Sequence, residues 1–238
     1  MATWNKGFRL TWLGHSAFEL VSSKDKVVLF DPWLEGNPCC PKHRKHPARA
    51  DAIALSHAHG DHSSDVVKIA ARLGCTVIGG FEVIEHLGEK GLKNGIGMNP
   101  GGTVRVAGLA FTMVPAVHSS SFDEPGRPDG GSEIGYVVTL EDGTRLYYTG
   151  DTGPTMEMVM VRELYAPEIA ILPIGDLYTM GPREAAWAAE KLGSKWIVPM
   201  HYGTFPALTG TPAALREELK RRGVAAEVIA PEPGEAVS

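Results

Sequence analysis

Apolar and polar residues alternate at the start of the chain, a pattern typical of strands that bury one face. Residues 8–12 alternate in this way, and residues 17–21 resume the pattern after a turn at Gly14-His15-Ser16. The apolar run of residues 27–30 ends at Asp31-Pro32. These three short segments predict a β-meander.

Strands and helices then begin to alternate. A strand, a helix, a strand, a helix and a turn-rich link are predicted in turn, over residues 53–56, 63–74, 76–78, 81–89 and 91–102. Ser63 or Ser64 can cap the first of these helices, and Gly74 ends it. The segment therefore has the organisation of a β-α-β unit.

The second half of the chain repeats this order without repeating the sequence. Strands are predicted over residues 103–106, 109–115, 134–140 and 145–148, followed by a helix that carries Met156, Val159, Met160 and Leu164. Strands over residues 169–172, 196–199 and 227–229 then alternate with helices over residues 181–193 and 211–223. Two such halves are expected to pack sheet on sheet with helices outside. No linker separates them, so we expect one domain over residues 1–238.

The densest chemistry lies in His57-Ala58-His59-Gly60-Asp61-His62, directly after the apolar run of residues 53–55. Residues i and i+2 of an extended chain point the same way, so His57 and His59 can hold one cation. Gly60 lets the backbone turn, which frees Asp61 and His62 for a second cation. Imidazole and carboxylate ligands suit Zn²⁺ and its first-row neighbours. The alternative, a solvated polar loop, fits a single histidine better than this spacing.

Other candidate ligands follow predicted strands by a few residues. His118 comes after residues 109–115, Asp151 after residues 145–148, and His201 after residues 196–199. We therefore expect all three to converge on one edge of the sheets. Asp151 arrives from a separate segment, which suits it to bridge two cations, and Thr152 could orient its carboxylate.

Composition limits the partners. Formal net charge is −5 and no block of Lys or Arg stands out, which disfavours nucleic acid. The three cysteines are odd in number and two are adjacent, so a reducing, cytoplasmic location is expected. Residues 1–11 do not resemble a signal peptide, and no apolar run reaches the roughly 20 residues of a membrane span. A small-molecule substrate is the expected partner, and a homo-oligomer is compatible with this composition.

The set His57-x-His59-x-Asp61-His62, His118, Gly150-Asp151-Thr152 and His201 resembles the metallo-β-lactamase superfamily. The resemblance implies an α/β fold, a four-layer αβ/βα sandwich of two mixed sheets flanked by helices. It also implies His57, His59 and His118 on one metal, Asp61, His62 and His201 on a second, and Asp151 between them. Flanking segments such as Leu13-Gly14-His15-Ser16 and Met200-His201-Tyr202-Gly203 are similar to a branch of metal-dependent hydrolases. That branch lies near the ascorbate-6-phosphate lactonases and the N-acyl-phosphatidylethanolamine phospholipases D.

This resemblance implies a hydrolase with two divalent metal ions, Zn²⁺ first, with Mn, Fe or Ni also compatible. Such ions lower the pKa of bound water, and the resulting hydroxide would cleave a small ester, lactone or phosphodiester. Asp61 is the candidate to orient the water or accept its proton, and His15 the candidate for a catalytic or substrate contact. Two alternatives stay open: a metal-binding protein without turnover, and a nuclease, which the acidic charge disfavours.

Five further residues are considered. Asp31 could fix the tautomer of a ligand imidazole or simply end a strand. Ser56 is explained by strand-end polarity. Cys40 or His43, in the loop of residues 35–50, could contact substrate at the rim of the site. His86 is expected to be a solvated residue on the surface of its helix.

Overall fold

The structure is a computed structural model that describes residue 4 and residues 6–238. The expectation that residues 1–11 are not a signal peptide falls partly on residues 1–3 and 5, which lie outside the described residues. Within the described chain, none of the helices combines the length and apolar character needed to cross a membrane.

The strands form two sheets. The first sheet contains β1 (Arg9–Trp12), β2 (Phe18–Val21), β3 (Val27–Phe30), β4 (Ala52–Ala54), β5 (Thr76–Gly80), β6 (Gly95–Met98) and β14 (Ala236–Val237). The second contains β7 (Thr103–Val106), β8 (Leu109–Pro115), β9 (Ile134–Thr139), β10 (Arg145–Tyr148), β11 (Ile169–Pro173), β12 (Trp196–Met200) and β13 (Glu227–Val228). Their orders are β14-β1-β2-β3-β4-β5-β6 and β13-β12-β11-β10-β9-β8-β7. Both sheets mix parallel and antiparallel pairs, as expected.

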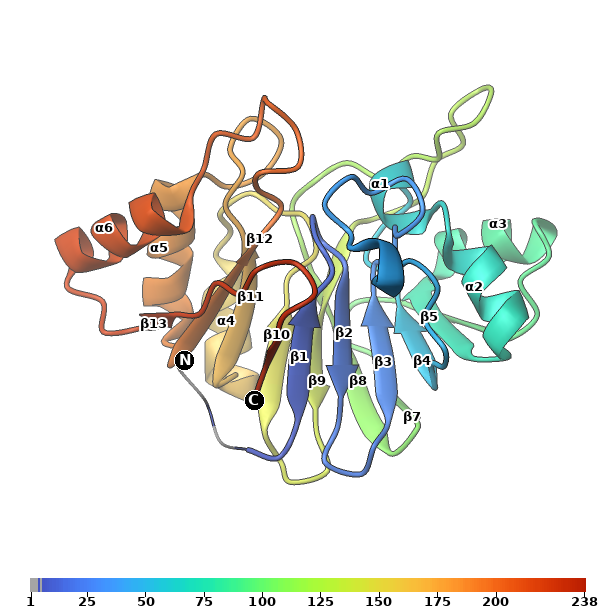
Figure 1. The fold of residues 1–238 in the computed structure, drawn as a ribbon, viewed down its shortest axis with the longest axis horizontal. Helices are drawn as coiled ribbons and strands as arrows, with labels where there is room; N and C mark the ends of the chain where they lie inside the picture. Colours follow the sequence, from blue (N-terminus) through green and yellow to red (C-terminus); the bar gives the residue numbers. More distant parts are fainter. Residues whose placement is uncertain (1–3, 5) are drawn as a thin grey trace.

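Helices cover the outer faces of the two sheets, so the architecture has four layers (Figure 1). The helices are α1 (Gly60–Ser63), α2 (Val66–Leu73), α3 (Phe81–Glu89), α4 (Glu157–Tyr165), α5 (Pro182–Leu192) and α6 (Pro212–Arg222), with a 3₁₀ turn η1 (Lys42–Arg44). The first sheet packs on α2 and α3, and the second on α4, α5 and α6. The α/β four-layer sandwich predicted from the sequence is therefore confirmed.

Strand alternation sets the layers. Phe18 and Leu20 of β2 lie in the core between the sheets, where they meet Phe111 of β8. Leu29 of β3 and Ile53 of β4 face the other way, into the core beneath α2 and α3. Because both faces of the central strands are covered, these strands are continuously apolar.

Several predicted boundaries need correction. The link of residues 91–102 contains β6, and the chain returns to the first sheet as β14, which was not predicted. The strand expected over residues 53–56 ends at Ala54.

Two predictions about helices are also wrong in part. Neither Ser63 nor Ser64 caps α2; the N-cap is Asp65, whose carboxylate instead accepts the N–H groups of Leu34 and Glu35. Gly74 does end α2 in the left-handed region. On α4 the buried residues are Met158 and Val161. Three of the four apolar residues singled out from the sequence are exposed instead: Met156, Met160 and Leu164.

Gly150 offers a test of how tightly the second sheet packs at the residue before Asp151. Its φ is +62°, and an added Cβ would lie 2.7 Å from both Ile134 O and Ser56 Cβ. Gly143 has a φ of +85° and open space around it. Gly143→Ala should therefore cost only the backbone strain, about 1 kcal/mol, and Gly150→Ala about 2 kcal/mol more through crowding. Urea unfolding of the metal-free variants measures both, and equal losses would contradict the packing.

Candidate metal centre

The candidate ligands come from five segments that end at the same edge of the two sheets. His57 and His59 follow β4, and Asp61 and His62 lie in α1. His118, Asp151 and His201 follow β8, β10 and β12. The structure brings six of these seven residues into two neighbouring groups, His57-His59-His118 and Asp61-His62-His201, and His15 lies with the second group.

In the first group the imidazole nitrogens converge. His57 Nε2 lies 3.0 Å from His59 Nδ1, and the His118 ring centroid lies 5.2 Å from each of the other two rings. Burial lowers the pKa of His57 and of His118, and neighbouring histidines lower both further. Neutral imidazoles with lone pairs directed at one point are what a first-row cation requires.

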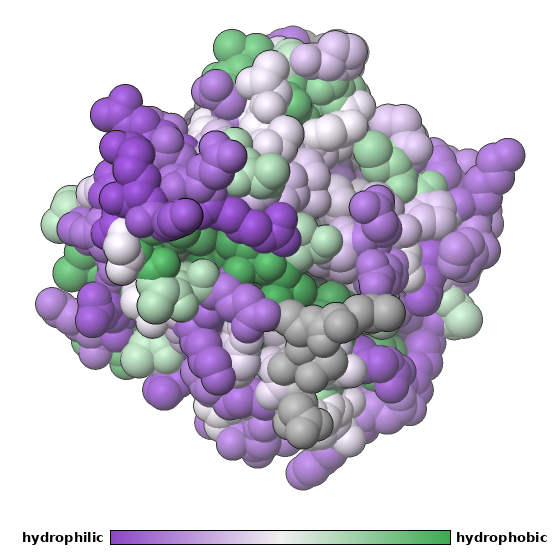
Figure 2. All heavy atoms as spheres, turned by 60° about the vertical axis from the view of Figure 1, so that its left-hand side comes forward, coloured by the Kyte–Doolittle hydropathy of each residue, from purple (hydrophilic) through white to green (hydrophobic). Residues whose placement is uncertain are grey.

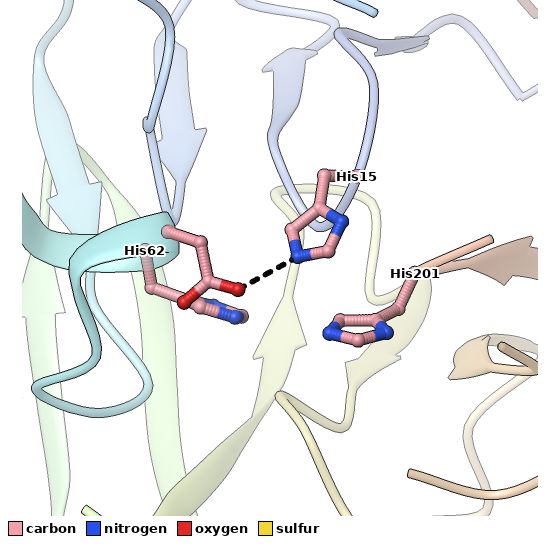
Figure 3. A group of neighbouring side chains, drawn as sticks. His15, His62 and His201 are labelled. Carbon is pink, nitrogen blue, oxygen red and sulfur yellow. Dashed lines mark hydrogen bonds and ion pairs between the residues drawn. The ribbon is translucent and has the colours of Figure 1, made fainter. Parts of the chain in front are cut away.

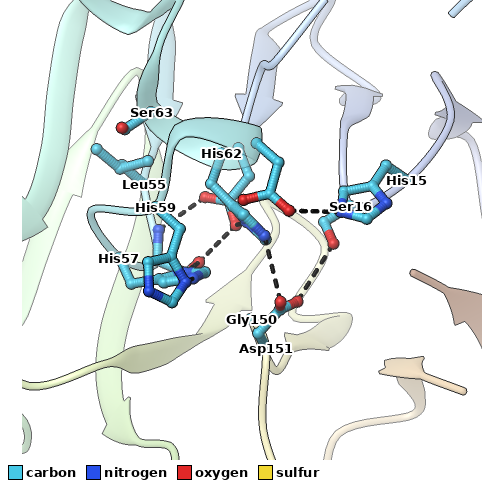
Figure 4. Close-up of polar contacts among 12 residues, drawn as sticks. His15, Ser16, Leu55, His57, His59, His62, Ser63, Gly150 and Asp151 are labelled. Carbon is cyan, nitrogen blue, oxygen red and sulfur yellow. Dashed lines mark hydrogen bonds and ion pairs between the residues drawn. The ribbon is translucent and has the colours of Figure 1, made fainter. Parts of the chain in front are cut away.

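Asp151 joins the two groups. Its Oδ2 lies 3.0 Å from His201 Nε2, 3.3 Å from His62 Nε2 and 3.8 Å from His118 Nε2. Its other oxygen accepts a hydrogen bond of 3.3 Å from the Ser16 hydroxyl (Figure 4). Burial by itself would raise the pKa of Asp151, but His201 and His62 outweigh it and hold that pKa well below its usual range.

A buried carboxylate behind the centre orients one imidazole of each group. Asp31 Oδ2 accepts from His62 Nδ1 at 2.6 Å and from the Ser56 hydroxyl at 2.5 Å, and the Tyr148 hydroxyl lies 2.7 Å away. Because the Ser56 hydroxyl donates to Asp31, it must accept from His57 Nδ1, 2.9 Å away. Asp31 thus leaves Nε2 of His57 and Nε2 of His62 facing the centre, and the expected hydrogen bond between Asp31 and a candidate ligand imidazole is present.

His62 differs from His57 and His118 in the direction of its pKa shift. Burial by itself would lower its pKa, but Asp151 and Asp31 on its two sides hold the pKa well above its ordinary value. In the metal-free protein a proton on His62 therefore balances two buried carboxylates. A cation at Nε2 would replace that proton.

His15 is completely buried beside the second group (Figure 3). Its Nε2 lies 3.0 Å from Asp61 Oδ2 and its Nδ1 3.0 Å from Thr204 Oγ1. Burial would raise the pKa of Asp61, but the hydrogen bond from His15 and the nearby His62 lower it below its usual range. Burial also lowers the pKa of His15. A neutral His15 therefore donates from Nε2 to ionised Asp61 and accepts the Thr204 hydroxyl at Nδ1.

The backbone is strained at this edge. His15, Asp31 and His201 have φ values of +55°, +40° and +55°, in the left-handed region that favours glycine. Gly175 permits this course, because an added Cβ would lie 2.0 Å from the carbonyl oxygen of His201. Such strain in non-glycine residues clusters at functional sites.

Three predictions about single residues are wrong. The Thr152 hydroxyl does not orient Asp151; it accepts from Val117 N at 3.0 Å and donates to the Gly153 carbonyl. Ser56 is not simply a polar strand end, because it links Asp31 to His57. Cys40 is buried and so is not placed to contact substrate, and burial raises the pKa of its thiol to about 11.

The expectation for His43 is also wrong. It lines a cleft of about 430 Å³ with Arg9 and Val21, residues at the ends of β1 and β2 that lie away from the centre.

His86 is not a solvated surface residue. Its ring packs on Phe122 with the ring centroids 4.0 Å apart, and its Nε2 lies 3.3 Å from Glu124 Oε1. The other oxygen of the Glu124 carboxylate lies 2.6 Å from Lys90 Nζ. These contacts fasten the loop of residues 119–132 to α3. The same loop supplies the Ser120 hydroxyl that accepts from Ala58 N, between His57 and His59.

Fold and centre together define a metal-binding αβ/βα sandwich. A family model described as the beta-lactamase superfamily domain matches residues 26–202. UPF0173 metal-dependent hydrolases from Roseiflexus castenholzii and Methanopyrus kandleri are 43% and 46% identical, over 100% and 95% of this chain and 100% and 98% of theirs. The chain belongs to the metallo-β-lactamase superfamily, as a metal-dependent hydrolase.

Solved structures agree with this assignment. Igni18, described as a metallo hydrolase from Ignicoccus hospitalis, is 36% identical with a TM-score of 0.85, covering 97% of both chains. An isothiocyanate hydrolase from Delia radicum gut bacteria has a TM-score of 0.74 over 97% of this chain and 98% of its own. At 22% identity, it is similar to this chain in fold alone.

Asp31→Asn should weaken metal retention about 10–100-fold, because an amide oxygen orients His62 without balancing its charge. Competition with a chelator, followed by metal analysis, measures the change. Asp51→Asn is the matched control, because Asp51 caps the N–H of Val27 at the far end of β3. Equal retention in both variants would contradict the role of Asp31.

His86→Ala should keep the metal content of the parent protein, since His86 contacts no candidate ligand. Loss of the Phe122 stack should nevertheless speed hydrogen exchange of residues 119–132 by about tenfold. His46→Ala provides the control, because the side chain of His46 is 72% exposed. Unchanged exchange in His86→Ala would show that other contacts hold the loop.

Proposed function

We propose that the centre holds two divalent metal ions, with Zn²⁺ as the first candidate, and hydrolyses a small ester, lactone or phosphodiester. His57, His59 and His118 would bind one ion, and Asp61, His62 and His201 the other. Asp151 would lie between them.

The donor set supports this assignment. Oδ2 of Asp151 faces a nitrogen from each group within 4 Å. His62 Nε2 is buried and meets Asp151 Oδ2 at 3.3 Å without the geometry of a hydrogen bond, as expected for two atoms that would share a cation. Three imidazoles in one group, and the carboxylates of Asp61 and Asp151 beside them, also match the preference of first-row metals for nitrogen and hard oxygen ligands.

The chain's own residues have distinct tasks in this reaction. Divalent ions at such a centre supply Lewis acidity, which makes water acidic enough to ionise near neutral pH. Asp61 is ionised and half-buried, so its free lone pairs can orient the attacking water and accept its proton. His15 holds Asp61 from behind through its Nε2–H, and Asp61 would pass the proton taken from the water to the leaving group.

The bridging position of Asp151 carries the proposal. Two alternatives compete with it: a protein that binds metal without turnover, and a nuclease. In the described part of the chain, Asp61 and Asp151 form ion pairs with histidines and with no Lys or Arg, and the formal net charge is −5, which together disfavour a nucleic-acid backbone as substrate.

Reconstituted protein should contain about two metal ions per chain and hydrolyse members of an ester, lactone and phosphodiester panel. Asp151→Ala should lose at least one ion and lower kcat/KM about a hundredfold or more, because the like charges lose their shared counter-ion. His15→Ala should keep both ions and lower kcat. Elemental analysis with steady-state kinetics measures both effects.

Asp142→Ala, in the turn between β9 and β10, is the control and should match the parent protein in both measurements. Full metal content and a normal rate in Asp151→Ala would exclude the bridging role. Two bound ions with no turnover on the whole panel would favour the protein without catalytic activity.

A further inference from the structure

Large apolar side chains are exposed around the candidate metal centre. Val117 (52% exposed) and Phe205 (39%) lie on loops that carry candidate ligands, and Leu177 (66%) and Tyr178 (58%) lie on the loop after β11, the strand between β10 and β12. We name these four residues the apolar rim. Single exposed hydrophobic residues are common on protein surfaces, whereas a group of them beside one site marks a binding surface.

Backbone contacts place Val117 and Leu177 close to the ligands. Val117 precedes His118, and its carbonyl accepts from Gly153 N, two residues after Asp151, at 2.8 Å. Leu177 lies in the loop after β11, in which Met180 N donates to the carbonyl of Thr152, beside Asp151, at 3.2 Å.

Phe205 lies on the His15 side of the centre. Its ring centroid lies 5.5 Å from that of His15 and 6.1 Å from that of Trp33. Figure 2 shows apolar side chains at the top of the molecule, the end at which the loops after β11 and β12 rise in Figure 1. The metal centre is thus bordered by apolar side chains from separate loops.

The loop after β11 has two energetically unfavourable features, a left-handed backbone and exposed apolar side chains. Asp176 and Leu177 are consecutive left-handed residues, with φ values of +68° and +53°, and a leucine disfavours that region. The Asp176 carboxylate stabilises the turn by accepting from Leu177 N at 2.8 Å. Exposure of Leu177 and Tyr178 is also unfavourable in water.

The charges at the metal centre restrict which substrates can bind beside the apolar rim. Asp61 and Asp151 form ion pairs only with histidines in the described chain. No Lys or Arg is therefore held at the centre by these carboxylates, although recognition of a phosphate group usually relies on Lys or Arg.

We infer that the substrate carries an uncharged apolar alkyl or aryl group beside its scissile bond, and that the apolar rim binds this group. The inference rests on the proposed hydrolysis at the same centre. It excludes phosphomonoesters and small, highly polar sugars as preferred substrates.

The first test measures binding without turnover. Zinc-loaded protein should bind octanohydroxamate at least about tenfold more tightly than acetohydroxamate, because each buried methylene favours binding. Leu177→Ser and Phe205→Ser should reduce this ratio several-fold. Leu164→Ser should keep it, because Leu164 is 63% exposed but lies on α4, away from the rim. Equal binding of the two hydroxamates, or equal effects of Leu177→Ser and Leu164→Ser, would overturn the inference.

The second test uses nitrophenyl acetate, butyrate and hexanoate. We expect kcat/KM to rise about two- to fourfold per methylene, mainly through KM, and this slope to decrease in Leu177→Ser. If the esters are hydrolysed at rates that do not depend on chain length, the binding role of the apolar rim is contradicted and the proposed hydrolysis is not. If none of the esters is hydrolysed but the preference for octanohydroxamate remains, the proposed ester hydrolysis is contradicted and the role of the apolar rim is not. Light scattering that shows Leu177→Ser to dissociate an oligomer would assign the rim to a subunit interface instead.

Discussion

The contact between Asp31 and His62 is the constraint on which this centre depends. Both side chains are fully buried, and a charged pair in that position is stable only if every remaining lone pair is satisfied. Ser56 and Tyr148 supply the additional donors, from the segments that follow β4 and end β10. One carboxylate therefore ties both sheets together and directs an imidazole nitrogen of each ligand group toward the centre.

Much of the fold could be predicted because buried strands leave a strong pattern. Residues 27–30 and 109–115 are strands in both prediction and structure. β6 and β14 were missed because they are short edge strands, whose pairing depends on a distant partner rather than on apolar residues. On α4 the apolar residues surround the helix, so its sequence does not reveal that Met158 rather than Met160 meets the core.

The candidate ligands were visible in the sequence, but the residues that orient them were not. Histidines and aspartates at this spacing are rarely required by folding alone, whereas a serine or tyrosine in a strand is common in any sheet. Ser56, Tyr148 and Thr204 acquire their roles only when the sheets bring Asp31 and His15 against them. His86 was misjudged for the same reason, since its partner Phe122 is distant in sequence.

The division of the candidate ligands between the layers has a mechanical consequence. His57, His59, Asp61 and His62 follow a strand of the first sheet, and His118, Asp151 and His201 follow strands of the second. Cations held between them would cross-link segments far apart in the sequence, as a disulfide does, and would oppose separation of the layers. Catalysis and the rigidity of the sandwich would then depend on the same bonds. Loss of the metal ions would therefore stop the reaction and also weaken the packing of one sheet against the other.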